Sequence, residues 1–175
     1  MKIRSIIILL AVIMTIISCG PSKNSEISKI NEMETSLFDE KGGMVSLEKA
    51  NELVNAYIKF AGDFPGDSMA SEYLFKAADI SMNINQAQQA IDLYNRIIEE
   101  YPDFRKVAEC LFLKGYVYEN SLGDLQQAEA IYREFIEKYP DNDFADDAEI
   151  SIQNLGKSPE DLIREFEEKM KAQEE

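Results

Sequence analysis

The chain repeats itself with a period of 38 residues. When residues 70–103 are aligned with residues 108–141, eleven of the 34 positions are identical. The identical pairs include small residues, one tyrosine inside the unit and a motif that closes it: Ala70 with Ala108, Ala90 with Ala128, Tyr94 with Tyr132, Tyr101 with Tyr139, Pro102 with Pro140, and Asp103 with Asp141. A period of ~20 to 50 residues is typical of a solenoid, in which each unit buries its apolar face against its neighbours.

Each unit is predicted to contain two helices. In the second copy, apolar and small residues follow helical spacing on both sides of Gly123. They are Leu111, Gly115 and Tyr118 before it, and Ala128, Ile131, Tyr132 and Phe135 after it. Pro140 ends the second helix, because a proline inside a helix costs ~3 kcal/mol. The spacing therefore predicts helix, turn, helix in each period.

A more diverged unit precedes these two copies. Its residues Leu53, Tyr57, Phe60, Phe64 and Pro65 have the spacing of Ala90, Tyr94, Ile97, Tyr101 and Pro102. We expect its first helix near residues 26–38, and a turn at Gly42 and Gly43.

Two more helices are expected after the last copy. One covers about residues 144–154 and stops at Gly156, and the other opens with Ser158 and Pro159, a residue pair that favours a helix start. The last helix has apolar residues on one side: Leu162, Ile163, Phe166 and Met170. Such a helix suits the end of a solenoid. The expected fold is an all-α solenoid of about three helix pairs over residues 29–157, with a C-terminal capping helix over residues 158–175.

The segments YNRIIEEYPD and YREFIEKYPD, followed by ADDAE, resemble tetratricopeptide repeats, especially those of bacterial envelope proteins. The resemblance covers roughly residues 48–154. The repeats of this chain are similar in kind to those of the β-barrel assembly lipoprotein BamD and of the Tol-Pal coordinator. The chain is too short to hold the five repeats of BamD, and it lacks the N-terminal coiled coil of the Tol-Pal coordinator. The period of 38 departs from the family's usual 34, and Ala77 stands where Gly115 supplies the family's glycine.

Residues 1–18 are predicted to be a signal peptide. Lys2 and Arg4 precede twelve apolar or near-apolar residues, from Ile6 to Ile17, which are too few for a spanning helix of ~20 residues. The junction at Ser18, Cys19 and Gly20 resembles the lipobox of bacterial lipoproteins, which implies that Cys19 carries a lipid. Ordinary cleavage beside an accidental cysteine is the alternative.

The polar residues after Cys19 are expected to form a flexible tether over residues 19–28. Two or more acyl chains would hold the protein firmly at a membrane. The expected location is the bacterial cell envelope, at the outer membrane and facing the periplasm. If Cys19 is acylated, Cys110 has no intramolecular partner for a disulfide, and we expect it to be a small buried apolar residue.

Composition argues against catalysis and against nucleic acid as a partner. The formal net charge is −15, which opposes binding to phosphate backbones. The chain has no histidine, which is the commonest general base and metal ligand. Pairs of acidic residues are interpreted as solvated helix faces. We therefore expect no enzyme activity, no cofactor and no metal site.

The first helix of each unit is expected to line a groove that binds a segment of another protein. By the resemblance, the groove positions are Ser71, Leu74, Ala78 and Ser81 in one unit and Glu109, Phe112, Tyr116 and Glu119 in the next. Phe112 and Tyr116 are the best anchors, because large aromatic residues dominate many interfaces, unless they pack on neighbouring helices.

The expected function is that of a lipid-anchored adaptor that binds protein partners in outer-membrane or cell-wall assembly. The alternative is a surface lipoprotein that captures carbohydrate, which the absence of tryptophan disfavours.

Overall fold

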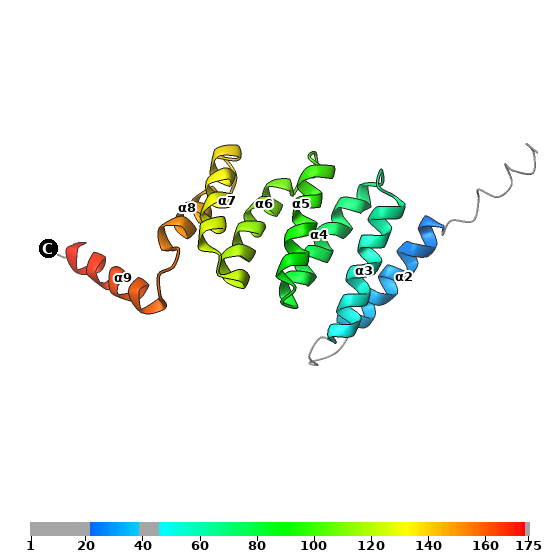
Figure 1. Ribbon diagram of the computed structural model, residues 1–175, viewed down its shortest axis with the longest axis horizontal. Coiled ribbons are helices and arrows are strands. Elements are labelled where there is room, and N and C mark those ends of the chain that lie inside the picture. The colour runs from blue at the N-terminus through cyan, green and yellow to red at the C-terminus, as the bar shows by residue number, and fades with distance from the viewer. Residues whose placement is uncertain (1–21, 39–45, 174–175) are drawn as a thin grey trace, which may run out of the picture.

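The computed structural model describes residues 22–38 and 46–173, and every regular element in this part of the chain is a helix (Figure 1). In chain order the elements are α2 (Lys23–Phe38), α3 (Leu47–Asp63), α4 (Ser68–Asn83), α5 (Ala87–Glu100), α6 (Val107–Val117), the π-helix η2 (Tyr118–Leu122), α7 (Leu125–Lys138), α8 (Ala145–Asn154) and α9 (Pro159–Gln173). Consecutive helices pack together from α2 to α8, so the pairs α2–α3, α4–α5 and α6–α7 stand in a row (Figure 1). This confirms the expected all-α helical-repeat solenoid.

Short polar side chains set the helix starts. Asp67 and Asp124 accept hydrogen bonds from backbone N–H groups in the first turns of α4 and α7, at 2.9 and 3.1 Å, and Ser46 does the same for α3. The second helices end where the repeat motif predicts, because α5 stops at Glu100 and α7 at Lys138, each just before a Tyr-Pro pair.

The turns inside the two central units have the same backbone geometry. Asn85 and Gly123 lie one period apart, and both adopt left-handed dihedrals, with φ of 60° and 66°. The expected break at Gly123 is confirmed, but the helix before it continues as the π-helix η2. The first unit has no such π-helix among the described residues, because α4 stays α-helical to Asn83.

The second helices carry the centre of the core. Tyr57, Tyr94 and Tyr132 have the same place in three successive units, and at most 1% of each side chain is exposed. Buried apolar residues form one cluster from α2 to α6 and a second cluster from α6 to α8. The apolar core thus runs along the whole row of helices, as stacked repeats require.

The N-terminal boundaries differ from the expected ones. Residues 23–28, expected within a flexible tether, form the first turns of α2, where Glu26 is buried and Ile27 packs against the core. These contacts with α3 order a segment that composition alone marks as polar. Cys19 and the expected turn at Gly42 and Gly43 lie outside the described residues.

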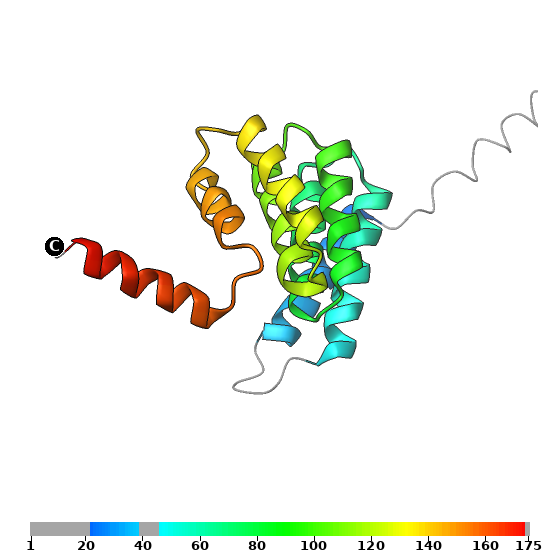
Figure 2. The same cartoon turned by 60° about the vertical axis from the view of Figure 1, so that its left-hand side comes forward.

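The last helix forms as expected, but it does not cover the end of the solenoid. Figures 1 and 2 show α9 extending away from α8, and α9 has no close packing with any other described helix. Its apolar side chains are exposed: Leu162, Ile163, Phe166 and Met170. Among the described helices none packs closely on this stripe, so the capping role of the last helix stays a prediction. The helix start is as expected, since Ser158 Oγ accepts from the N–H of Asp161 at 3.1 Å.

Candidate partner-binding surfaces

The predicted groove positions of the first central unit are inside the core. Leu74, Ala78 and Ser81 are fully buried, and only 6% of Ser71 is exposed. Leu74, Ala78 and Ser81 therefore cannot contact a partner in this structure, which contradicts the prediction for these three residues. The reason is that α4 packs between α3 and α5 and gives many of its side chains to the core, so only a strip of its surface stays open. Ser71 differs, because it lines a cleft between the α3–α4 turn and the α5–α6 turn, and its role stays a prediction.

The open strip of α4 is polar. Lys76 and Asn83 are exposed on it, and Glu72 and Asp79 are half-buried. These residues recur at steps of three and four and therefore share one helix face. The groove positions predicted from the resemblance lie beside this strip, on the sides that pack.

The predicted positions in the second central unit differ from one another. Tyr116 is 43% exposed, so it is available as an anchor. Phe112 packs instead, because its ring stacks on Phe144 with centroids 5.0 Å apart and contacts Tyr132 and Phe135. Of the two alternatives considered for these aromatic residues, packing holds for Phe112 and exposure for Tyr116.

Glu109 and Glu119 are half-buried and have structural partners. Glu119 accepts a hydrogen bond from the Tyr132 hydroxyl at 2.8 Å, and Glu109 lies 3.8 Å from the Lys106 ammonium. Neither side chain is a free acidic contact for a partner.

A hollow of about 370 Å³ opens beside α2, α3 and α4. It is lined by Glu34, Tyr57, Lys76, Asp79, Ile80 and Asn83. Glu34 accepts hydrogen bonds from the Tyr57 hydroxyl and from Lys76 Nζ, the latter at 2.7 Å. Burial opposes ionisation of Glu34, but these two donors outweigh it, so the pKa of Glu34 lies below its ordinary value.

The pKa of Asp79, in the same hollow, is shifted in the opposite direction. Burial raises the pKa of Asp79, and the Tyr94 hydroxyl at 2.9 Å and the positive charge of Lys106 only partly offset this. Lys106 Nζ also lies 4.0 Å from the centre of the Phe75 ring. The hollow therefore contains one stabilised carboxylate and one whose charge is disfavoured.

Sequence reasoning missed a feature that all three helix pairs share. In each pair the buried tyrosine of the second helix donates to a carboxylate on the first helix or on its π-helical extension: Tyr57 to Glu34, Tyr94 to Asp79 and, on η2, Tyr132 to Glu119. A buried phenol needs an acceptor, so the signal was an acidic residue near the end of each first helix. Its spacing from the tyrosine varies, which hid the pattern.

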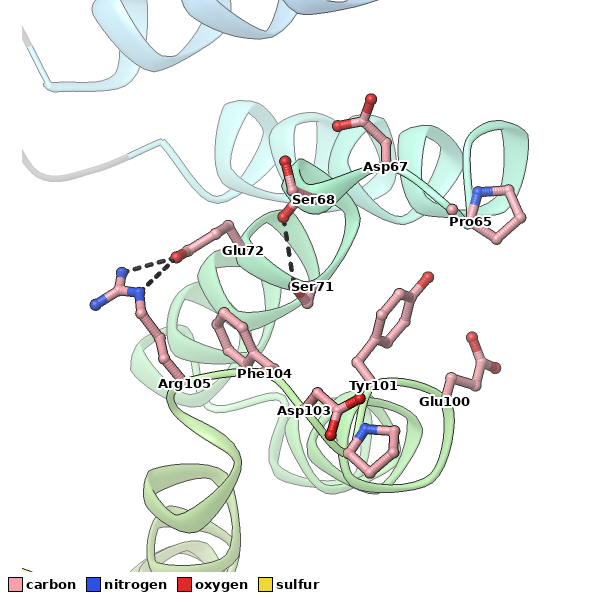
Figure 3. Close-up of a pocket in the computed structure, with 12 residues that line it drawn as sticks. Pro65, Asp67, Ser68, Ser71, Glu72, Glu100, Tyr101, Asp103, Phe104 and Arg105 are labelled. Atoms are coloured by element: carbon pink, nitrogen blue, oxygen red, sulfur yellow. Dashed lines mark hydrogen bonds and ion pairs between the residues drawn. The ribbon is translucent and has the colours of Figure 1, made fainter.

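A larger cleft of about 560 Å³ lies between the α3–α4 turn and the α5–α6 turn (Figure 3). Arg105 donates to Glu72 Oε1 across it, at 3.0 and 2.7 Å. Three more carboxylates line the cleft: Asp67, Glu100 and Asp103. Lys23 pairs with Asp67 and Arg96 pairs with Glu100 from outside this lining, so most of the negative charge of the cleft is compensated.

One polar atom of this cleft has no partner. The Tyr101 hydroxyl is buried and forms no hydrogen bond with any of the described residues. Figure 3 shows its ring pointing toward the Pro65 turn. Burial raises the pKa of this hydroxyl, so it stays protonated and can donate.

Residues 22–38 and 46–173 contain no group of three or more histidine, cysteine, aspartate or glutamate side chains that could hold a metal ion. No helix in this part of the chain is long and apolar enough to cross a membrane. Cys110 is buried, which raises the pKa of its thiol to about 12 and confirms that it is a small core residue.

The comparison with known families agrees with this geometry. A family model described as tetratricopeptide repeat matches residues 72–103 and 109–142, which correspond to α4–α5 and α6–α7. No curated protein matches the chain. Repeats of this family typically act as non-catalytic scaffolds that bind other proteins. Residues 72–142 of this chain are therefore a tandem of tetratricopeptide repeats.

Proposed function

We propose that this chain is a lipid-anchored adaptor of the bacterial cell envelope, which holds a protein partner on its repeats beside the outer membrane. The observation that carries the proposal is the repeat tandem with an exposed aromatic residue on a first helix: Tyr116 is 43% exposed and makes no ring contact with the described residues. An exposed tyrosine on a rigid helix is a favourable anchor for another polypeptide.

The polar strip of α4 is a second open surface that would contribute to the selection of a partner. The strip of α4 next to the 370 Å³ hollow presents Lys76 and Asn83, and the chain as a whole is strongly acidic. Charged and amide groups fix the register of a bound segment, while the aromatic anchor supplies most of the affinity. We infer that the partner presents an apolar residue to Tyr116 and hydrogen-bonding groups to the α4 strip.

The location rests on the N-terminal residues. The apolar stretch from Ile6 to Ile17 and the lipobox-like Ser18, Cys19 and Gly20 support export and acylation at Cys19. Diacylglycerol and a third acyl chain would bury enough methylene groups for stable anchoring, at ~0.8 kcal/mol each. The repeats would then work close to the membrane, in outer-membrane or cell-wall assembly.

The binding surface is tested by photo-crosslinking in the native bacterium. A crosslinking residue at Tyr116 should give a discrete adduct with one protein, and the same residue at Glu99, which is exposed on α5, should not. With the identified partner purified, Tyr116→Ala should weaken binding by about 2 kcal/mol, which is roughly thirtyfold. Equal adducts from both positions, or unchanged binding by Tyr116→Ala, would refute this surface.

The anchor is tested separately. Cys19→Ser should move the protein from the membrane fraction to the soluble periplasmic fraction after cell breakage. The Cys110→Ser variant is the control, because that thiol is buried and distant in sequence from the junction. If Cys19→Ser remains in the membrane fraction as completely as the control, a lipid on Cys19 is not what holds the protein there.

A further inference from the structure

The Tyr101 hydroxyl is a polar group that the fold does not need. Phe64, Tyr101 and Tyr139 each follow a second helix in the same conformation, with φ of −131°, −132° and −134°, and each N–H donates to the carbonyl four residues before it. Phe64 fills this place without a hydroxyl, and its ring packs on Phe60 with centroids 5.0 Å apart. The Tyr101 hydroxyl is buried and has no hydrogen-bond partner among the described residues, which lowers the stability of the free protein. A ligand that accepts its hydrogen bond would remove this cost.

The cleft of about 560 Å³ is where such a ligand would lie. In Figure 3 the Tyr101 ring stands in the cleft and points toward the Pro65 turn. Two proline rings and one more aromatic ring line the same cleft: Pro65, Pro102 and Phe104. Ser71 lines it as well, so one of the predicted partner-binding residues belongs to this surface. The cleft therefore combines apolar ring surfaces with one unused donor, and a tilt of the Tyr101 ring into the open space would uncover its hydroxyl.

The acceptors of the cleft are largely occupied. Three of the four carboxylates that line it already pair with a basic residue: Asp67 with Lys23, Glu72 with Arg105, and Glu100 with Arg96. The fourth, Asp103, is exposed to solvent. A segment that brought several N–H groups would leave some of them without an acceptor, which is costly in a partly closed site. The cleft therefore suits an uncharged segment that offers carbonyl groups but few N–H groups.

We propose that this cleft binds a proline-rich segment of a protein partner in the polyproline II conformation, with a backbone carbonyl that accepts from the Tyr101 hydroxyl. Proline has a carbonyl but no N–H, and the carbonyl groups of polyproline II make no hydrogen bonds within the segment. Its rings can pack on Pro65, Pro102 and Phe104, as in other aromatic-lined grooves that bind such segments. The site rests on the proposed function, because its ligand is part of a protein partner, but it is separate from Tyr116, which does not line the cleft.

A defined peptide tests the site. Decaproline added to the isotope-labelled full chain, purified in detergent, should shift the amide NMR signals of Gly66 and Phe104 in a saturable way, while a Gly-Ser peptide of the same length should not. Tyr101→Phe removes only the hydroxyl and should weaken decaproline binding about five- to tenfold. Tyr139→Phe is the matched control and should bind like wild type, because Tyr139 has the same place in the next unit but does not line the cleft.

The free protein gives a second measurement, which separates binding from folding. Without peptide, Tyr101→Phe should raise the Tm by about 2 °C, because it removes a buried donor that has no partner. Tyr94→Phe should lower the Tm instead, because its hydroxyl donates to Asp79 at 2.9 Å. If Tyr101→Phe lowers the Tm as much as Tyr94→Phe does, the hydroxyl already has a partner in the free protein, such as a bound water, and the proposal is overturned.

Three binding results would also overturn the proposal: no shift of the cleft amide signals with decaproline, equal shifts with the Gly-Ser peptide, or equal affinity of Tyr101→Phe and wild type. Tyr116→Ala separates this site from the surface proposed above. That variant should bind decaproline as wild type does, since Tyr116 lies outside the cleft, and a loss of binding would contradict the cleft as the site. Failure of crosslinking at Tyr116 would leave the decaproline result unchanged, so the two proposals can fail independently.

Discussion

The two central repeats solve the same packing problem with different residues. In the first, the buried Tyr94 donates to Asp79 at 2.9 Å, and in the second, Tyr132 donates to Glu119 at 2.8 Å. The acceptors do not occupy equivalent positions, since one period after Asp79 stands Val117. The second unit places its carboxylate on the π-helix η2, one residue past its start. Both repeats therefore keep a hydrogen bond from the buried tyrosine hydroxyl, but the position of the accepting residue differs.

The approach of the two helices differs in the same way. A Cβ atom on Gly115 would lie 2.8 and 2.9 Å from two atoms of the Tyr132 ring, so the tyrosine lies directly on the glycine. The first unit has Ala77 at the equivalent position, fully buried. The first pair thus accommodates a methyl group that the second pair excludes. A period in sequence does not guarantee identical helix spacing.

Truncation of the buried tyrosines should change the free energy of unfolding of the two repeats the most. Tyr94→Ala and Tyr132→Ala should each lower the free energy of unfolding by ~3 to 5 kcal/mol, because each leaves a large cavity. Tyr94→Ala should lower it more, since Tyr94 belongs to the long cluster from α2 to α6, while the cluster of Tyr132 ends at α8. Urea denaturation checks both values. Arg133→Ala is the control, because its side chain is exposed, and a larger loss for Tyr132→Ala would reverse the ranking.

Exchange of the small residues should have the next largest effect. Gly115→Ala should lower the free energy of unfolding by ~1 to 3 kcal/mol through overpacking against Tyr132. Ala77→Gly should lower it by ~2 kcal/mol, because it loses helix propensity and also removes a buried methyl group.

Gly62→Ala in α3 controls for the propensity gain of alanine. No atom lies within 4 Å of its added methyl group, so this change should raise the free energy of unfolding by ~0.5 to 1 kcal/mol. If Gly115→Ala is as stabilising as Gly62→Ala in the same denaturation measurement, the Tyr132 ring does not pack directly on Gly115 in the second repeat.

The left-handed turns should show a smaller difference. Gly123→Ala should cost ~1 kcal/mol, because φ is +66° and alanine is strained there. Asn85→Gly should change the free energy of unfolding by only a few tenths of a kcal/mol, since asparagine already tolerates this conformation. Gly66→Ala, in a turn with open space and no positive φ, is the control. Equal losses for Gly123→Ala and Gly66→Ala in thermal unfolding would remove the special role of the turn.

The repeat architecture was predictable because its signals are local. The spacing of Tyr94 and Tyr132, and the Tyr-Pro pairs that end the second helices, follow from helix geometry within one unit. The binding residues were not predictable in the same way. Whether Leu74 or Phe112 is open depends on which sides of its helix the neighbouring units cover, and this is a property of the stack. Tyr116 was found because it lies on the remaining open side.

The ends of the domain were harder to predict than its middle. The polar residues 23–28 suggested a tether, but contacts with α3 make them helical. The stripe on α9 suggested a cap, but periodicity shows only that a face is apolar and does not show what covers it. The carboxylate acceptors were missed because Tyr57, Tyr94 and Tyr132 lie at different sequence distances from them.

The pH dependence of the free energy of unfolding should show the smallest effect. It should differ between Asp79 and Glu34, which is the counterpart of Asp79 in the N-terminal helix pair. Burial raises the pKa of Asp79 above its ordinary 3.8, so the folded state binds this proton more tightly than the unfolded chain does. The stability from protonated Asp79 is complete below the unfolded pKa and is lost as the pH rises through the folded pKa. As the pH rises through this range, Asp79→Asn should therefore become more stable relative to wild type. Its amide has no charge to bury, and its oxygen can still accept the hydrogen bond from Tyr94.

Glu34 should respond in the opposite direction. Its pKa is lowered below 4.5, because hydrogen bonds from Lys76 and Tyr57 outweigh burial, so its contribution is complete above the unfolded pKa and is lost as the pH falls through the folded one. Glu34→Gln should thus be destabilising at pH 7 and approach wild type in acid. Urea unfolding across a pH series measures both variants. If Asp79→Asn and Glu34→Gln follow the same pH dependence, the two carboxylates do not differ in electrostatic state, although each accepts a hydrogen bond from a buried tyrosine.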